Sequence, residues 1–142
     1  MTSGGMGTMG YSIPAAVGTA MAQRDMGIKT PIFAVCGDGS FQMSLMELAT
    51  IKGNELPVKI VLFVNNRLGM VRELQDKLYE ERKIGVFLDG SPDFVKLVES
   101  YGIKAMQLDA SVSDPKQVLE EFVAYEGACL LQVSVSPGES TL

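Results

Sequence analysis

The chain has 142 residues, of which 46% are hydrophobic, so it suits one domain with its own core and leaves no room for a second. Its 12 Lys and Arg against 17 Asp and Glu give a net charge of −5 without a basic run, which argues against nucleic acid as a partner. The sequence contains no His, which excludes Ser-His, Cys-His and His-metal chemistry.

The cysteines and the lack of long apolar stretches indicate the compartment. Cys36 and Cys129 each lie in an apolar, strand-like run, which is typical of reduced, buried thiols rather than of a disulfide framework. No charged and then apolar leader opens the sequence, and no apolar stretch approaches the length that spans a membrane. We therefore expect a soluble, cytoplasmic protein that has no membrane partner.

Apolar strand patterns alternate with helical patterns along the chain. In chain order, they predict a helix over 14–23, a strand over 31–36, a helix over 42–52, a strand over 58–64, helices over 70–81 and 91–101, a strand over 104–108, a helix over 114–125 and a strand over 129–135. This alternation favours a parallel sheet in a three-layer α/β/α fold. The apolar segment 84–90 is either a mobile loop or contact surface, or an ordinary ordered connection.

Polar residues follow two of the predicted strands. Gly37-Asp38-Gly39 comes directly after the strand over 31–36, and Asn65-Asn66 ends the strand over 58–64. Because the carboxyl ends of parallel strands line one crevice, we expect Asp38 and Asn66 to meet there. Their oxygens suit one Mg2+, which would hold an anionic diphosphate that the negative net charge of the chain otherwise disfavours.

A glycine-rich stretch near the start matches a dinucleotide-binding fingerprint. Residues 5–10 read GMGTMG, which fits G-x-G-x-x-G. That fingerprint needs a strand immediately before it, and only four residues precede it here, so we do not expect nicotinamide or flavin binding. The glycines either let the backbone approach a ligand or another chain, or form a flexible terminus.

Taken together, these motifs resemble the C-terminal, diphosphate-binding domain of acetolactate synthase, a thiamine-diphosphate enzyme. The resemblance extends from residue 2 to about residue 135. It rests on GGMGTMGY at 4–11, GDGSFQM at 37–43, ELAT at 47–50, NN at 65–66 and LGMV at 68–71, with 25 residues, 40–64, between GDG and NN. It implies that residues 1–142 form a single C-terminal thiamine-diphosphate-binding domain, either excised from a larger enzyme or encoded separately.

The resemblance also implies a set of ligands. Asp38, the side chain of Asn66 and the main-chain carbonyl of Leu68 would bind Mg2+, and two diphosphate oxygens and a water would complete its shell. The residues expected to bind thiamine diphosphate are Gly7, Thr8, Met9, Gly37, Gly39, Ser40, Met43, Asn66, Gly69 and Met70.

Individual roles within that set follow from the same resemblance. Met9 would support the bent cofactor between its two rings, while Met43 and Met70 would line the pocket, although a methionine more often fills a core. Glu47 is a candidate acid, but its place on a helix favours a structural or capping role. Leu74 stands where many synthases carry a Trp that shapes the acceptor site, which leaves substrate choice open.

No catalytic residue is expected in this chain. In the family, the glutamate that activates the cofactor belongs to the N-terminal, pyrimidine-binding domain of a neighbouring subunit, so we expect no turnover by this chain alone. Its partners would be that domain and a 2-oxoacid substrate. We further expect a homo-oligomer, because an exposed apolar face has to find another subunit.

Three functions remain open at this stage. The first is part of an acetolactate synthase, which decarboxylates and joins pyruvate in branched-chain amino acid biosynthesis. The second is the beta part of a two-subunit decarboxylase of the sulfopyruvate or phosphonopyruvate type. SPDFVKL at 91–97 resembles the synthase more closely. The third is a scaffold without chemistry, against which the intact Asp38 and Asn66 argue.

Overall fold

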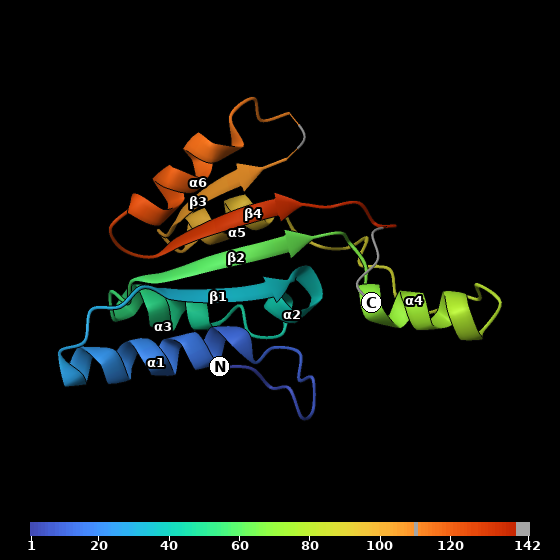
Figure 1. The fold of residues 1–142 in the computed structure, drawn as a ribbon, viewed down its shortest axis with the longest axis horizontal. Coiled ribbons are helices and arrows are strands. Elements are labelled where there is room, and N and C mark those ends of the chain that lie inside the picture. The colour runs from blue at the N-terminus through green and yellow to red at the C-terminus, as the bar shows by residue number, and fades with distance from the viewer. Residues whose placement is uncertain (110, 139–142) are drawn as a thin grey trace.

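A sheet of parallel strands lies at the centre of the protein (Figure 1). This computed structural model describes residues 1–109 and 111–138. Its strands are β1 (Ile32–Gly37), β2 (Val58–Val64), β3 (Lys104–Leu108) and β4 (Cys129–Ser134), in the spatial order β1-β2-β4-β3. All three neighbouring pairs are parallel, which confirms the predicted sheet.

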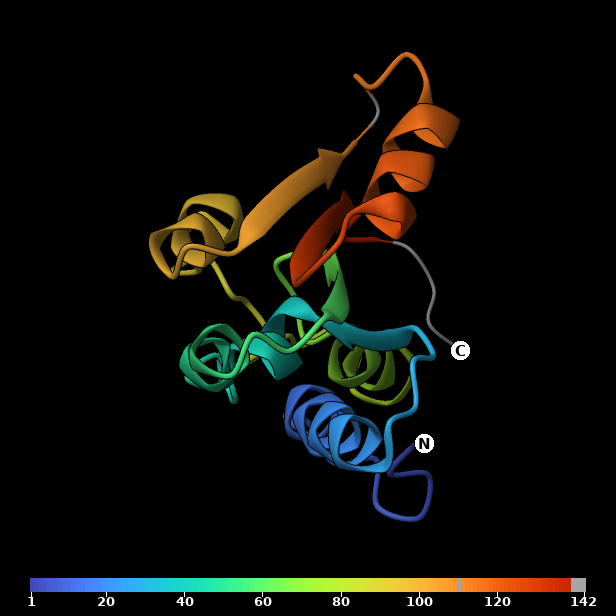
Figure 2. The same cartoon turned by 90° about the vertical axis from the view of Figure 1, so that its left-hand side faces the viewer.

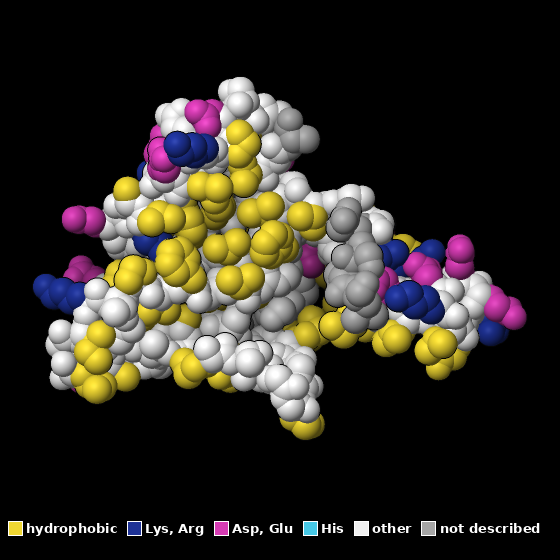
Figure 3. Space-filling model, viewed as in Figure 1, with side chains coloured by type: hydrophobic (Ala, Val, Ile, Leu, Met, Phe, Trp, Pro, Cys, Tyr) yellow, Lys and Arg dark blue, Asp and Glu magenta, His cyan; other side chains and the backbone are white. Residues whose placement is uncertain are grey.

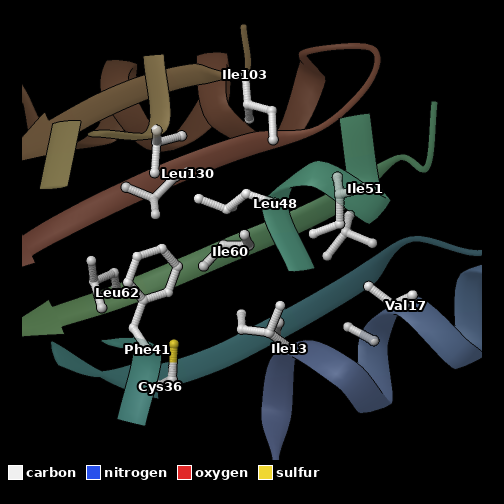
Figure 4. Close-up of a cluster of buried hydrophobic side chains, with 14 of the residues drawn as sticks. Ile13, Val17, Cys36, Phe41, Leu48, Ile51, Ile60, Leu62, Ile103 and Leu130 are labelled. Atoms are coloured by element: carbon white, nitrogen blue, oxygen red, sulfur yellow. The ribbon is translucent and has the colours of Figure 1, made fainter. Parts of the chain in front are cut away.

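Three helices cover one face of the sheet. They are α1 (Ser12–Met26), α3 (Glu47–Gly53) and α5 (Phe94–Ser100). Ile13 and Val17 of α1, Leu48 and Ile51 of α3, and the inward side chains of β1 and β2 form one buried cluster with Leu130 of β4 (Figure 4). Burying this apolar area is the main driving force that fixes these helices on the sheet.

The opposite face of the sheet is covered only in part. Helix α6 (Pro115–Ala124) places Phe122 against Cys129 and Leu131 of β4. Above β1 and β2 the face stays open, since Phe33, Val35 and Phe63 are 47%, 56% and 41% exposed. The space-filling view shows an apolar patch over this part of the sheet (Figure 3). The expected three-layer α/β/α arrangement is present, with α6 as its second helical layer.

The predicted helix over 42–52 is not continuous in the structure: residue 42 ends one short helix, residues 43–46 form a turn, and residues 47–52 lie in α3. Helix α2 (Asp38–Gln42) begins directly at the end of β1, and α3 follows after four residues. Between them the Ser44 amide donates to Phe41 O over 3.1 Å and the Glu47 amide to Ser44 O over 3.0 Å. These bonds span three residues rather than four, so the chain winds more tightly and changes direction while Phe41 and Leu48 both stay buried.

Helix α4 (Gly69–Leu78) extends away from the sheet (Figure 1), and in the turned view it is seen nearly end-on (Figure 2). It ends three residues before the predicted boundary at 81 because Glu80 and Glu81 have left-handed backbones, with φ of 54° and 58°. Met70, Leu74 and Leu78 recur every four residues and are all exposed. The segment after α4 is ordered: Val86 is fully buried, and its carbonyl accepts the Leu68 amide over 2.9 Å.

Two further expectations concern the cysteines and the membrane. Cys36 and Cys129 are both buried and unpaired, as predicted. Within the described part of the chain, no helix has the length and apolar character that a membrane crossing requires.

Candidate functional site

Asp38 joins the carboxyl ends of β1 and β2. It is only 2% exposed, and its Oδ1 accepts the Gly39 amide over 2.8 Å. Its Oδ2 accepts the amide of Asn66 over 2.7 Å and that of Asn65 over 3.2 Å. The structure therefore brings the two predicted strand ends together, as expected for the crevice of a parallel sheet.

A pocket of about 470 Å³ opens beside this carboxylate. Its walls come from the N-terminal segment, from both strand ends and from the start of α4. It is lined by Met9, Gly37, Asp38, Gly39, Ser40, Phe63, Asn65, Arg67, Leu68, Gly69, Met70, Val71 and Val135. Eight of the predicted site residues thus share one pocket: Met9, Gly37, Asp38, Gly39, Ser40, Leu68, Gly69 and Met70.

Four of the predicted site residues do not line this pocket. Gly7 and Thr8 lie in the exposed turn at the start of the chain, where the Thr8 amide donates to Ser3 Oγ over 2.9 Å. Met43 is 59% exposed on the turn after α2. The fourth is Asn66, whose position is informative.

The two asparagines after β2 face different pockets. Asn65 lines the pocket of Asp38, whereas Asn66 lines a separate polar pocket that also contains Asp89. Asn66 has a left-handed backbone with φ of 55°, which turns the chain just after the strand. Asn65 is not among the residues that the sequence predicts for the site. The signal that could have found it is the one-residue alternation of side chains at the end of a strand.

The carbonyls that follow the asparagines also differ. The Leu68 carbonyl accepts the Arg72 amide over 2.9 Å as α4 begins. No hydrogen bond to the Arg67 carbonyl is found within residues 1–109 and 111–138. Arg67 itself is well fixed, because its amide donates to Asn65 Oδ1 over 2.9 Å and its guanidinium donates to Asp89 Oδ1 over 2.9 Å.

Gly39 forms the floor of the pocket. A Cβ built on it would lie 2.8 Å from Leu68 Cδ2, 3.1 Å from Met9 Cε and 3.4 Å from Leu88 Cδ1. The absent side chain lets these three apolar groups converge over the start of α2. The glycine-rich N-terminal segment is tied to the same place, since the Gly10 amide donates to Ser40 Oγ over 2.9 Å.

Two titratable groups near the site take no visible part in chemistry. Burial, and to a smaller extent the neighbouring Asp38 carboxylate, raises the pKa of the Cys36 thiol to about 11, although a hydrogen bond with Ser12 lowers it in part. Such a thiol stays protonated and unreactive near neutral pH. Glu47 lies in the first turn of α3 and does not line the pocket, which supports the structural alternative for it.

The oxygen atoms around Asp38 suit a cation that is coordinated partly by the protein and partly by a bound ligand. Across the described ranges, no cluster of three or more His, Cys, Asp or Glu side chains could enclose a metal. A carboxylate offers about four lone-pair sites. Three of those on Asp38 are taken by amides, so one stays available for a cation. Hard cations such as Mg2+ accept this arrangement, with amide and carbonyl oxygens completing the protein's share.

Comparison with known protein families decides what this pocket belongs to. The family model described as thiamine pyrophosphate enzyme, C-terminal TPP binding domain, matches residues 1–133. The chain belongs to this family. The predicted resemblance is therefore confirmed, and the pocket lies in a thiamine-diphosphate-binding domain.

Curated relatives of this chain are acetolactate synthase large subunits. It is 40% identical to that of Lactococcus lactis over 144 residues, which is 100% of this chain and 24% of the relative. It is 41% identical to the probable large subunit of Methanocaldococcus jannaschii over 99% of this chain and 23% of the relative. For isozyme 2 of Escherichia coli, the identity is 38%, over 99% of this chain and 25% of the relative. The chain thus spans about a quarter of the length of these relatives.

Solved structures of thiamine-dependent enzymes have the same fold. A benzoylformate decarboxylase from Polynucleobacter necessarius superposes with a TM-score of 0.84 at 26% identity, over 96% of this chain and 25% of that one. A putative thiamin diphosphate-dependent enzyme from Mycobacterium smegmatis gives a TM-score of 0.75 at 25% identity, over 94% and 23%. The family and its fold are therefore found in enzymes four times longer than this chain.

Proposed function

We propose that this domain binds the diphosphate of thiamine diphosphate through one Mg2+ at Asp38. The observation that carries the proposal is the Asp38 carboxylate, which is fixed by three amides at two strand ends and borders a 470 Å³ pocket. When bound, Mg2+ would offset the charge of the diphosphate, and the thiazolium of the cofactor would supply an electron sink.

The metal ligands that we propose differ in part from those expected from the sequence. Asp38 keeps its role. We propose Asn65 as the amide ligand, because it lines the pocket, whereas Asn66 lines the neighbouring one. Asn65 Oδ1 accepts the Arg67 amide and would offer its second lone pair to the cation. For the main-chain ligand we favour the carbonyl of Arg67 over that of Leu68, which already accepts the Arg72 amide.

The remaining walls of the pocket would position the cofactor. Gly69 and Met70 open α4, a helix of ten residues, so their amides suit a diphosphate oxygen. Met9 converges on Gly39 from the opposite wall, where it would support the cofactor rings. Gly7, Thr8 and Met43 would contribute only to parts of the cofactor that extend beyond the pocket.

Within a complete enzyme, the activity that we propose is that of an acetolactate synthase acting on pyruvate in branched-chain amino acid biosynthesis. The curated relatives support this function over a two-subunit decarboxylase. The pyrimidine-binding domain with its activating glutamate would come from elsewhere in the enzyme, and the active form would be a homo-oligomer. The chain alone would bind cofactor weakly and would not turn over.

Isothermal titration calorimetry tests the binding. Thiamine diphosphate is titrated into the wild type with and without Mg2+, and into Asp38→Asn. We expect Mg2+-dependent binding in the wild type and an affinity at least tenfold weaker in the variant. Equal heats under all three conditions would refute metal-bridged recognition.

A matched pair of variants tests the amide ligand. Asn65→Ala removes the amide from the pocket, while Asn66→Gly removes the other amide and still accepts the left-handed backbone. We expect only Asn65→Ala to weaken Mg2+-dependent binding markedly. If Asn66→Gly weakened binding more than Asn65→Ala, Asn66 would be the amide ligand instead.

The reaction requires the rest of the enzyme. The N-terminal three-quarters of the Lactococcus lactis relative is fused ahead of this chain, and the products from pyruvate are analysed. Acetolactate is the expected product. Acetaldehyde alone would favour the decarboxylase.

A further inference from the structure

Segment 84–90, the apolar connection after α4, is anchored in the fold by its own contacts. At its start, the side chain of Gln75 forms two hydrogen bonds of 3.0 Å with Ile84. Its Nε2 donates to the Ile84 carbonyl, and its Oε1 accepts the Ile84 amide. Two residues later, Val86 is fully buried. The segment therefore has a fixed position from which it can hold other parts of the chain.

This segment pairs with the turn that follows β2. The Leu68 amide donates to the Val86 carbonyl over 2.9 Å. The Leu88 amide donates to the Asn66 carbonyl over 3.0 Å, and the two stretches run antiparallel. The turn is the part of the chain in which we propose the side-chain and main-chain oxygens that bind Mg2+. Segment 84–90 thus contacts the proposed metal site from outside the pocket.

The side chain of Arg67 joins the same two stretches. Its Nη1 donates to Asp89 Oδ1 over 2.9 Å and to the Asn66 carbonyl over 2.6 Å. Its Cζ lies 4.6 Å from the ring centre of Phe87, so the guanidinium also packs on an aromatic ring. Residues of segment 84–90 therefore fix the guanidinium, which in turn binds the backbone of the turn.

The turn needs support because its backbone is unfavourable. Asn66 has a φ of 55°, and a residue other than glycine keeps this conformation only where its surroundings hold it. On one side, Asp38 accepts the amides of Asn65 and Asn66. On the other side, the Asn66 carbonyl accepts both the Leu88 amide and the Arg67 guanidinium. The turn is therefore held between a strand end and segment 84–90.

We propose that segment 84–90 positions the metal-binding turn, and that Asp89 is a positioning residue that acts through Arg67. The inference rests on the proposed function, in which Asn65 Oδ1 and the Arg67 carbonyl bind Mg2+. Asn65 Oδ1 accepts the Arg67 amide over 2.9 Å, so a shift of Arg67 displaces both proposed ligands. Mg2+ tolerates little displacement, because it requires near-octahedral ligands at about 2.0–2.1 Å.

Asp89 contributes little to the stability of the fold. Its side chain is 76% exposed, and an ion pair with so exposed a partner is weak in water. Residues that orient metal ligands nevertheless change metal affinity by about 10- to 100-fold when they are replaced. Removal of the Asp89 carboxylate should therefore change metal binding far more than it changes unfolding.

Hydrogen exchange tests the positioning without metal or cofactor. The amides of Leu68 and Leu88, which join the two stretches, are followed in Asp89→Ala and in the matched control Asp25→Ala. Asp25 also pairs with an arginine and is 75% exposed, but it lies near the end of α1. We expect both amides to exchange about threefold faster in Asp89→Ala only. Unchanged exchange in Asp89→Ala would overturn the proposal.

Two metals distinguish positioning from a simple loss of charge. Calorimetry compares the affinity for thiamine diphosphate in Mg2+ and in Ca2+, which accepts longer and more flexible ligand distances of about 2.3–2.6 Å. We expect Asp89→Ala to weaken binding in Mg2+ by about tenfold and in Ca2+ by much less. Asp89→Asn removes the charge but keeps an oxygen for Arg67, so it should retain most of the affinity in Mg2+.

The outcomes that contradict the proposal differ from those that contradict the proposed function. Equal losses in the two metals, or equal losses in Asp89→Ala and Asp25→Ala, would overturn the positioning role. So would a loss in Asp89→Asn as large as that in Asp89→Ala. A wild type that binds no cofactor with either metal would refute the proposed function instead, and the exchange rates would still decide whether Asp89 holds the turn.

Discussion

One charged side chain is buried at each end of the sheet, and the two side chains have different surroundings. Asp38 at the carboxyl end is 2% exposed, and Lys59 near the amino end is 6% exposed. Neither forms a salt bridge with a described residue. Each charge is therefore held by neutral dipoles, which is what an unpaired buried charge requires.

The surroundings of the two charges show which one is left for a ligand. The Lys59 ammonium donates to the carbonyl of Tyr125, which ends α6, and to that of Gly127, and it lies 5.0 Å from the Tyr125 ring centre. These contacts stabilise a helix end. Asp38 instead faces a pocket that α4 enters with its amino end. The buried charge of Asp38 thus borders a pocket and stays accessible to a ligand, while that of Lys59 is surrounded by carbonyls and rings of the fold.

The comparison predicts the largest loss of stability at the carboxyl end. Asp38→Ala would leave one buried and two partly buried amides without their acceptor, and we expect the free energy of unfolding to fall by about 3 to 5 kcal/mol. Urea denaturation followed by circular dichroism measures this. If Asp38→Ala lost less free energy of unfolding than Lys59→Met, the predicted difference between the two ends of the sheet would be wrong.

Alkaline pH should weaken the same end through Cys36. Its pKa is raised from 9.0 to about 11 in the fold, so the thiol stays protonated there while the unfolded chain ionises. The stabilising difference is complete below pH 9 and is lost as the pH rises through 11, by about 2 to 3 kcal/mol in all. Denaturation at pH 8 and pH 11 should show the drop in the wild type and a smaller one in Cys36→Ala.

At the amino end, Lys59→Met should cost less. The variant loses two hydrogen bonds at the end of α6 but also the cost of burying an ammonium, and we expect a net loss of about 1 kcal/mol. Burial lowers the pKa of Lys59, so this residue adds stability as the pH rises above its folded pKa. The variant should lack that rise. If the variant were as stable as the wild type at every pH, Lys59 would have no structural role.

The smallest effect on stability should come from Gly39→Ala. The nearest atoms to the added Cβ are side-chain ends of Leu68, Met9 and Leu88, which can shift, so we expect a loss of about 1 kcal/mol or less. The same shift narrows the pocket floor, and binding of thiamine diphosphate with Mg2+ should weaken far more than stability does. Calorimetry and thermal unfolding of one preparation separate the two. Parallel losses would show that Gly39 matters only for folding.

Much of the fold could be predicted because strands and helices have local signals. The four strands begin and end within one residue of the predicted positions, since runs such as residues 60–64 are continuously apolar. The break between α2 and α3 was missed because Phe41, Leu48 and Ile51 keep a helical spacing across it. The order β1-β2-β4-β3 and the direction of α4 depend on tertiary packing, which no local pattern specifies.

The sequence predicted which motifs come together at the site, but not which of the two asparagines lines the pocket. Spacing placed GDG and NN at neighbouring strand ends, and the structure brings them together. Which asparagine faces the pocket depends on the left-handed backbone of Asn66, and the sequence Asn65-Asn66 allows both choices. Successive residues point to opposite sides of a strand, so a shift by one position exchanges the pockets.

The three amides that donate to Asp38 also limit which residues can replace it during the evolution of this family. A descendant that no longer needed its cofactor would still need an acceptor for the amides of Gly39, Asn65 and Asn66. An aspartate can therefore be retained at this position for structural reasons after cofactor binding has been lost. Its presence alone is weak proof that a distant homologue is an enzyme.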